Sequence, residues 1–291
     1  MYESERRFFA EEVELAANVR SEALVAAFAA VPREEFLPPG PWQVLTLNPV
    51  TGQPSYRTTR DADPRRLLHN VAVALDPARQ LNTGHPASLA VWIDALSVAP
   101  GDRVVHVGCG TGYYTAILAM LAGEAGSVVA FEVDEQLARD AARNLRPWPQ
   151  VRVEGDGAAR GELPQADAIL INAGAAHLLP QWLTALAPGG RLLVPLTFSP
   201  VGEAAGAHAA GAGIMIRIDR HGDELAARAI SPVAIYPCRG ARDEAANRLL
   251  GEALRTAGWR SLARLRTDRH EREADCWLHH EEACLSSKSS M

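Results

Sequence analysis

Apolar and polar positions follow a helical pattern at the start of the chain. Over residues 5–30 apolar side chains recur among charged ones at roughly helical spacing, and Pro32 follows. This predicts one or two amphipathic helices that end before the proline. Residues 38–64 are rich in Pro, Gly, Thr, Asn and Arg and have little periodicity, so we expect a long connection or an irregular cap. The helical pattern returns over residues 86–96.

From residue 104 onward, short apolar runs alternate with helical patterns. Strands are predicted at residues 104–107, 128–131, 151–153, 168–171 and 191–194, with helices at 114–121, 135–145 and 178–186. Strands that alternate with helices at this spacing form parallel sheets covered on both faces. The pattern therefore predicts an α/β fold with a doubly wound, Rossmann-like sheet.

The last third of the chain predicts antiparallel additions to this sheet. The predicted elements are a loop at 199–213, strands at 214–218 and 225–235, a helix at 242–257, strands at 261–266 and around 276–279, and a disordered Ser-rich tail. We divide the chain into an N-terminal helical region with an irregular connection (1–84), a central domain (85–238) and a C-terminal extension packed on that domain (239–291).

Composition and charge narrow the class of protein. Of 291 residues, 47% are hydrophobic and 22% are charged, which is ordinary for a globular protein. The formal net charge of −6 disfavours a nucleic-acid partner. No apolar run has the length of a signal peptide or a membrane span, and four cysteines form no disulfide framework. We expect a cytoplasmic protein that does not bind membranes.

A glycine-rich turn is the main candidate for ligand binding. The run Gly108-Cys109-Gly110-Thr111-Gly112 follows a predicted strand and opens a helix, where backbone N–H groups are free. Glu132 and Asp156 end the next two strands, where they can accept hydrogen bonds from ribose hydroxyls and an adenine amine. This predicts a nucleoside-containing cofactor. Tyr113 occupies the third glycine position of the dinucleotide fingerprint, which disfavours NAD and FAD.

Several motifs in order resemble one enzyme family. They are the run from Val104 to Tyr113, Ala29-Ala30-Val31-Pro32-Arg33-Glu34-Glu35-Phe36, Gly155-Asp156-Gly157 with Arg160-Gly161, Asp167-Ala168-Ile169, the run from Leu186 to Pro195, and Tyr236-Pro237. The chain is similar in these motifs to protein-L-isoaspartate O-methyltransferases, which are class I S-adenosylmethionine-dependent methyltransferases. The resemblance implies a mostly parallel seven-stranded sheet over roughly residues 20–238.

The resemblance also implies roles for individual residues. The cofactor is S-adenosyl-L-methionine, and the product is S-adenosyl-L-homocysteine. Its binding residues would be Gly108, Cys109, Gly110 and Gly112 near the methionine part, Glu132 at the ribose, Asp156 at the adenine, Val133 and Gly157 beside the adenine, and Asn172 where cofactor and acceptor meet. The acceptor would be an isoaspartyl residue of a protein or peptide.

The departures from the family pattern bear on the acceptor side. The family has a Gly-Gln-Thr-Ile-Ser stretch, where this chain has Arg79-Gln80-Leu81-Asn82-Thr83-Gly84-His85-Pro86. Thr83 then stands for the serine as a positioning group, with Asn82 and His85 as further candidates on the substrate side. His106 replaces a carboxylate that supports the glycine turn, and we expect it to form a local hydrogen bond.

Other functions stay open from the sequence. A carboxylate acceptor is ionised at neutral pH and needs no general base, whereas a hydroxyl or amine acceptor would make His85 or His177 the candidate bases. The acceptor could instead be a small molecule, a dedicated peptide or RNA, and a non-catalytic cofactor-binding scaffold is a further alternative. The segments outside the resemblance could also build a homo-oligomer contact.

A cluster of possible metal ligands lies near the C-terminus. His270, Cys276, His279, His280 and Cys284 have a spacing that matches none of the paired zinc signatures. Their pattern is instead that of a strand with a polar flank. The sequence therefore predicts no metal site.

Overall fold

The computed structural model describes residues 2–52, 54–79, 81–155, 161–199, 210–281 and 283–287. Five strands run parallel, as the alternating pattern predicted: β5 (Arg103–Val107), β6 (Ser127–Phe131), β7 (Val151–Glu154), β8 (Ala166–Ile171) and β9 (Leu186–Phe198). Five more pair antiparallel beyond them: β10 (Gly211–His221), β11 (Glu224–Ile235), β12 (Arg264–Arg266), β13 (Cys276–His279) and β14 (Cys284–Ser286). The doubly wound fold is confirmed.

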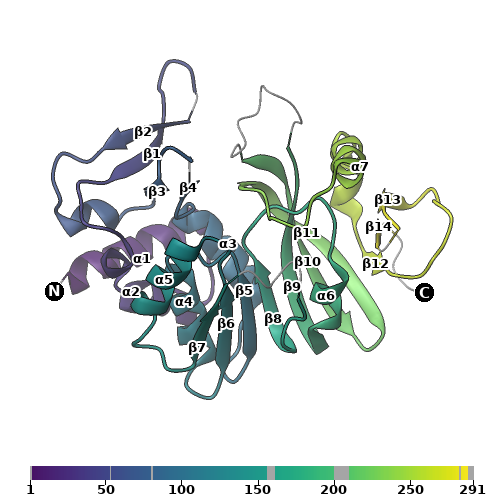
Figure 1. Ribbon diagram of the computed structural model, residues 1–291, viewed down its shortest axis with the longest axis horizontal. Helices are drawn as coiled ribbons and strands as arrows, with labels where there is room; N and C mark the ends of the chain where they lie inside the picture. The colour runs from purple at the N-terminus through teal and green to yellow at the C-terminus, as the bar shows by residue number, and fades with distance from the viewer. Residues whose placement is uncertain are drawn as a thin grey trace.

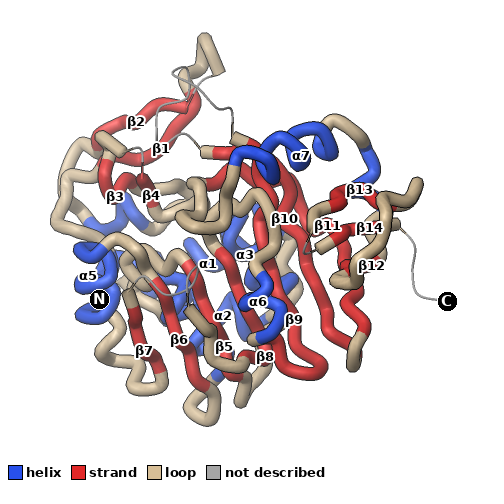
Figure 2. The backbone as a smooth tube through the Cα atoms, turned by 45° about the vertical axis from the view of Figure 1, so that its right-hand side comes forward, coloured by secondary structure: helices blue, strands red, loops and turns tan. Residues whose placement is uncertain are grey.

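All ten strands belong to one sheet, ordered β13-β14-β12-β11-β10-β9-β8-β5-β6-β7 (Figure 2). Seven of them, β5 to β11, lie within residues 20–238, as the resemblance implied, and β12, β13 and β14 of the C-terminal extension continue the sheet past β11. Strand β14 was not predicted. The expected loop at 199–213 lies mostly in residues 200–209, outside the described residues, and so does the end of the tail at 288–291.

Helices cover both faces of the sheet (Figure 1). One face packs against α1 (Glu3–Ala17), α2 (Glu22–Ala30), α3 (Pro86–Leu96), α4 (Tyr113–Ala122) and α5 (Glu135–Asn144), and the other against α6 (Pro180–Thr184) and α7 (Glu244–Leu254). Neighbouring strand residues divide between the two cores: Val104 and Ala168 face the first, Val105 and Ile169 the second. None of the described helices is both long and apolar enough to cross a bilayer.

The expectation of an irregular stretch at 38–64 is wrong. It contains the hairpin of β1 (Gln43–Leu47) and β2 (Pro54–Thr58), and a second hairpin of β3 (Ala74–Asp76) and β4 (Leu81–Asn82) follows. Val44 is the one described residue of the first hairpin that is buried, so the apolar pattern is weak there. Figure 1 shows the two hairpins together at one end of the sheet.

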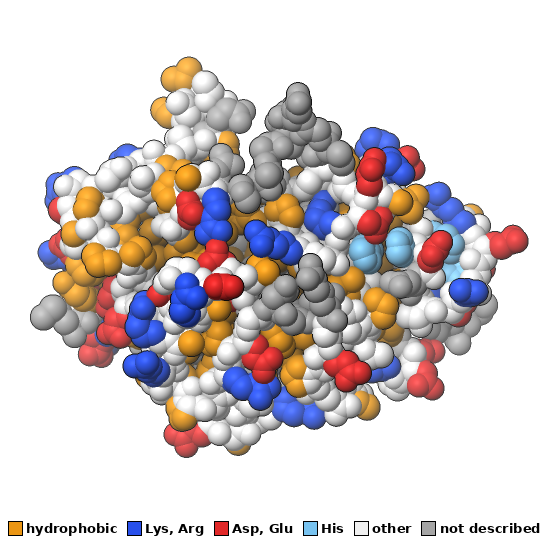
Figure 3. All heavy atoms as spheres, in the orientation of Figure 1, with side chains coloured by type: hydrophobic (Ala, Val, Ile, Leu, Met, Phe, Trp, Pro, Cys, Tyr) orange, Lys and Arg blue, Asp and Glu red, His pale blue; other side chains and the backbone are white. Residues whose placement is uncertain are grey.

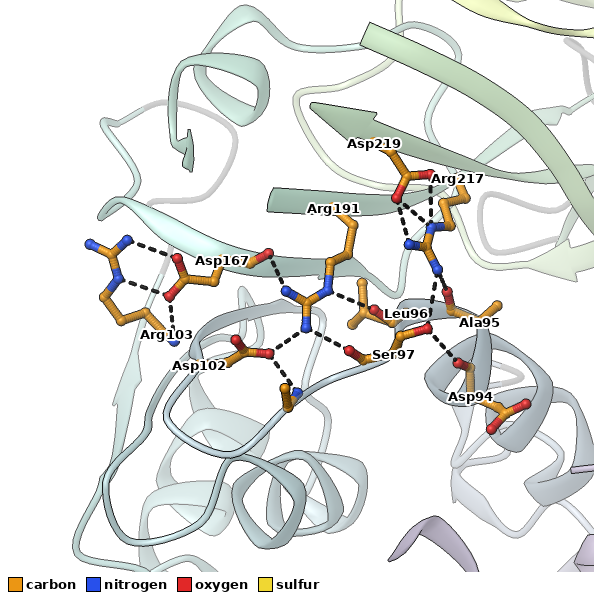
Figure 4. Close-up of polar contacts among 11 residues, drawn as sticks. Asp94, Ala95, Leu96, Ser97, Asp102, Arg103, Asp167, Arg191, Arg217 and Asp219 are labelled. Atoms are coloured by element: carbon orange, nitrogen blue, oxygen red, sulfur yellow. Dashed lines mark hydrogen bonds and ion pairs between the residues drawn. The ribbon is translucent and has the colours of Figure 1, made fainter. Parts of the chain in front are cut away.

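Two arginines fix α3 at the amino ends of the strands (Figure 4). Arg191 of β9 donates to the carbonyl oxygens of Leu96 (2.9 Å) and Ser97 (2.6 Å), and Arg217 of β10 donates to that of Ala95. The last carbonyls of a helix have no partner within the helix, so these arginines satisfy them. The contacts stabilise the end of the sheet opposite to the glycine turn.

Candidate functional site

The turn after β5 is built for close approach of a ligand to the backbone. Gly108, Gly110 and Gly112 have φ values of 79°, 57° and 97°, a region that other residues rarely adopt. A Cβ on Gly108 would lie 3.0 Å from the carbonyl oxygen of Asn172. One on Gly110 would meet, among the described residues, only the Leu75 side chain, at 3.8 Å. The backbone of Gly110 therefore keeps an open side at the start of α4.

Glu132, which follows β6, is bonded to this turn. The side chain is only 8% exposed, and its two oxygens accept the N–H groups of Gly110 (2.7 Å) and Asp134 (3.0 Å). Burial raises the pKa of Glu132, and these two N–H donors oppose that rise. A carboxylate offers about four lone-pair positions, so Glu132 keeps capacity for ribose hydroxyls beside these bonds. The sequence did not foresee that Glu132 also fixes the glycine turn.

The β3–β4 hairpin lies over the turn and is tied to the far side of the site. Arg79 donates to Asp76 (2.6 Å) within the hairpin and to Asp134 (2.7 Å) beside Glu132. Asp134 in turn accepts the N–H groups that begin α5. The arginine therefore connects the hairpin to the strand end that carries Glu132, 55 residues away along the chain.

Asn82 joins three segments that are distant in sequence. Its Nδ2 group donates to the hydroxyls of Tyr56 and Tyr236, both at 3.0 Å, and its Oδ1 atom accepts the N–H of Gly84 (2.9 Å). Tyr56 comes from β2, and Tyr236 follows β11. Burial, together with the neighbouring Tyr56, raises the pKa of Tyr236. Sequence reasoning found Asn82 but not Tyr56, whose strand lies in the stretch expected to be irregular.

Thr83 has two of its hydrogen-bonding positions in use. Its hydroxyl accepts the N–H of Val73 (3.1 Å) and donates to the carbonyl of Gly84 (3.1 Å). With respect to the described residues, one lone pair of the hydroxyl oxygen remains. His85, beside it, is exposed where α3 begins.

Asn172, at the end of β8, closes the other side of the turn. Its backbone N–H donates to Val107 (2.8 Å), and its Nδ2 group donates to the carbonyl of Gly108 (3.3 Å). The next residues run beside the segment after β11: Gly174 bonds to the carbonyl of Tyr236 (2.7 Å) and accepts the N–H of Cys238 (2.8 Å). The loop after β8 and the Asn82 contact are therefore neighbours.

The buried Arg33 is a residue whose role the sequence did not reveal. It is 1% exposed and donates to the carbonyl oxygens of Leu67 (2.6 Å), His69 (2.8 Å) and Val71 (2.6 Å). These carbonyls belong to the connection that leads into β3. Arg33 thus positions the hairpin over the glycine turn. In the sequence, its importance was indicated only by its place in the family motif of residues 29–36.

Two histidines have structural surroundings. His106 is fully buried, its Nδ1 atom lies 2.9 Å from the Thr115 hydroxyl, and burial lowers its pKa to about 3. The expected local hydrogen bond of His106 is confirmed. His177 stacks on His280 at 5.1 Å between ring centroids, and its Nδ1 atom lies 3.6 Å from Asp243. That position is among residues of the C-terminal extension.

Four further residues were predicted to bind the cofactor: Cys109, Val133, Asp156 and Gly157. Cys109 is buried in the turn, and Val133 is 39% exposed next to Glu132. Asp156 and Gly157 lie outside the described residues, so their adenine-side roles stay predictions.

Comparisons with known proteins agree with this geometry. The family model described as Protein-L-isoaspartate(D-aspartate) O-methyltransferase (PCMT) matches residues 70–206. Protein-L-isoaspartate O-methyltransferase 1 of Anaeromyxobacter sp. (strain Fw109-5) is 30% identical over 233 residues, which cover 78% of this chain and 92% of the relative. The chain belongs to the protein-L-isoaspartate O-methyltransferase family. It is thus a member of a family of S-adenosylmethionine-dependent methyltransferases.

Other members of the family match over different lengths. Protein-L-isoaspartate O-methyltransferase 1 of Rhodopseudomonas palustris (strain HaA2) is 34% identical over 185 residues, and the match spans 62% of this chain and just under two thirds (64%) of that relative. A solved structure from Plasmodium falciparum, titled as a PCMT in complex with S-adenosyl-L-homocysteine, has a TM-score of 0.59 at 14% identity and covers 81% of this chain and 98% of its own. This last similarity supports the fold.

Proposed function

We propose that this chain transfers the methyl group of S-adenosylmethionine to a carboxylate of a protein or peptide, in the simplest case an isoaspartyl residue. The observation that carries this proposal is the β3–β4 hairpin over the glycine turn, with the uncharged side chains of Asn82 and Thr83 near the place where cofactor and acceptor would meet. The carboxylate attacks the methyl carbon in line, the carbon–sulfur bond breaks, and neutral S-adenosylhomocysteine leaves. No proton has to be removed, because a carboxylate with a pKa near ~4 is already ionised.

Different residues around the turn would bind different parts of the cofactor. We assign Gly108, Cys109, Gly110 and Gly112 to the methionine part, Glu132 to the ribose, Asp156, Val133 and Gly157 to the adenine, and Asn172 to the junction with the acceptor. The remaining lone-pair capacity of Glu132 and the side of Gly110 that is open toward the described residues support this division.

Thr83 would position the acceptor through its oxygen. While its one hydroxyl hydrogen is directed to the Gly84 carbonyl, Thr83 has no hydrogen to donate to a carboxylate, but its free lone pair can accept an N–H group. A peptide backbone provides such an N–H group, whereas a simple carboxylic acid does not. This contact favours a peptide acceptor over a small carboxylate.

Methyl transfer to matched peptides tests the acceptor. The protein is incubated with labelled S-adenosylmethionine and an isoaspartyl peptide, beside its normal aspartyl twin. We expect label in the isoaspartyl peptide as a base-labile ester. Equal labelling of both peptides, or none, would overturn the acceptor, and an RNA-dependent increase in labelling would point to RNA instead.

Calorimetry separates failure of the acceptor from failure of the cofactor. We expect S-adenosylhomocysteine to bind the purified protein, and Asp156→Ala to weaken binding by about 1.5–3 kcal/mol through loss of a charge-assisted hydrogen bond. Absence of binding to the unaltered protein would overturn the cofactor, whereas binding without methyl transfer to any acceptor would support the non-catalytic cofactor-binding scaffold. Unchanged affinity in the variant would show that the adenine lies elsewhere.

A further inference from the structure

Four possible metal ligands come together at the C-terminal edge of the sheet. His270 lies in the link between β12 and β13, Cys276 and His279 are the first and last residues of β13, and Cys284 begins β14. One ligand atom from each of the four lies within 4.8 Å of all the others. The chain spacing gave no paired signature, because three separate segments supply the ligands.

A bulge in β13 explains how its two ligands share one side. Residues three apart in a regular strand point to opposite faces. The pairing of β13 with β14 shifts register between Cys276 and Leu278, which adds one residue to β13 and brings Cys276 and His279 together. The intervening Trp277 points away, and its Nε1 atom donates to the carbonyl of Ala253 in α7 (3.0 Å).

The distances are close to those of a tetrahedral site. Zinc–sulfur and zinc–nitrogen bonds of about 2.3 and 2.0 Å place neighbouring ligand atoms roughly 3.3–3.8 Å apart. The Nε2 atom of His270 lies 3.7 Å from the Sγ atom of Cys276. The remaining separations, at most 4.8 Å, need to shorten by about 1 Å or so to reach that geometry.

Groups around the cluster already hold the ligands as metal sites require. The Nδ1 atom of His270 lies 2.9 Å from the Asp268 carbonyl oxygen, which leaves Nε2 as the ligand atom. The N–H of Glu273 lies 3.3 Å from the Cys276 sulfur, where it stabilises a thiolate. The Nδ1 atom of His279 is buried without a hydrogen-bond partner in the described part of the chain, and coordination through it would satisfy it.

We propose that His270, Cys276, His279 and Cys284 bind one structural zinc ion. Two thiolates and two neutral imidazoles balance the charge of Zn²⁺, so the occupied site is neutral overall and can be buried at low cost. Four protein ligands leave no open position, which excludes a catalytic role for the ion. The zinc ties the exposed link between β12 and β13 to the last two strands of the sheet.

Metal analysis of the purified full chain is the direct test. We expect one zinc per chain, retained through gel filtration under reducing conditions, and near none in Cys276→Ser or Cys284→Ser. His280→Ala is the matched control, because this neighbouring histidine stacks on His177 outside the cluster, and it should keep the zinc. Less than stoichiometric zinc after reconstitution with ZnCl₂, or stoichiometric iron or copper, would overturn the assignment.

Cobalt replacement keeps the test decisive if the cysteine variants fail to fold. Co²⁺ bound to the unaltered protein should give tetrahedral ligand-field bands and a thiolate-to-cobalt charge-transfer band. Mass spectrometry gives the opposing outcome: a Cys276–Cys284 disulfide in protein that was reconstituted under reducing conditions would contradict a metal site.

Chelation should also accelerate amide exchange in residues 264–286 while exchange in 103–131 stays unchanged, and a uniform change would overturn a local structural role.

Discussion

The parallel half of the sheet and its C-terminal edge are stabilised in different ways. Strands β5, β6 and β8 are buried on both faces by apolar residues, and the glycine turn above them consists of backbone groups held by one carboxylate. Strands β12, β13 and β14 have three, four and three residues, and a cluster of His and Cys side chains lies among them. The large apolar core of the parallel half can support a site built from backbone groups. The short strands of the C-terminal edge depend instead on a few specific side chains.

The largest expected effect limits this contrast, because it comes from one buried polar side chain that packs in the core of the parallel half, Arg33. Arg33→Ala removes the donor to three carbonyl oxygens, of which that of His69 keeps the N–H of Val71, and should lower the free energy of unfolding by about 3–5 kcal/mol, as measured in urea. Arg7→Ala, an exposed arginine of α1, is the control and should change it by less than about 0.5 kcal/mol. A loss below about 1 kcal/mol in Arg33→Ala would mean that the connection into β3 is held by apolar packing.

A pH series sharpens the comparison through His106, in the centre of β5. Burial lowers its pKa from 6.5 to about 3, so the unfolded chain binds a proton below pH 6.5 that the folded chain does not. Stability should therefore fall as the pH falls from 6.5 toward 3, by up to about 1.4 kcal/mol per pH unit.

Unfolding of His106→Asn in urea from pH 6 to 4.5 isolates this contribution. Its loss of stability should be smaller than that of the unaltered protein by up to about 2 kcal/mol. His221→Asn, at an exposed turn, should follow the unaltered protein. Identical pH profiles for His106→Asn and the unaltered protein would contradict a buried neutral imidazole.

The site itself tests whether backbone geometry is sufficient for binding. Glu132→Gln replaces one acceptor oxygen by an NH₂ group that faces a backbone N–H, and S-adenosylhomocysteine should bind about 1.5–3 kcal/mol more weakly, or roughly 10- to 150-fold. Glu135→Gln, at the exposed start of α5, should bind normally in the same calorimetric titration. Equal affinity in both variants would show that the glycine turn alone holds the cofactor.

The smallest expected effect concerns the C-terminal edge of the sheet. Trp277→Phe removes the hydrogen bond to Ala253 and part of the packing between β13 and α7, at a cost of about 1–2 kcal/mol. The carbonyl of Ala253 keeps its bond from the Thr256 hydroxyl, which limits the loss. Amide exchange should show the change confined to residues 244–286, and a change that reaches β5 would contradict the separation of the two halves.

The sequence predicted the parallel half well because its signals are local. Runs such as residues 104–107 are apolar throughout, and the glycines and Glu132 lie at strand ends where ligands bind in open α/β folds. The roles of Arg33 and Tyr56 could not be predicted, because their partners are 34 or more and 26 residues away. The His and Cys residues near the C-terminus were recognised as possible ligands, but their coming together was not predicted, because a β-bulge, which leaves no mark in residue spacing, aligns Cys276 with His279.

The hydrogen bond between Asn82 and Tyr236 sets an order for assembly on the ribosome. Its partners are 154 positions apart, so at typical synthesis rates of about 5–20 residues per second roughly 8–30 s pass between their translation. Gly108, Gly110 and Glu132 are all made within that interval. The turn and its carboxylate are therefore translated while the hairpin above them still lacks its distant partner, and this corner is complete only after Tyr236 has been made.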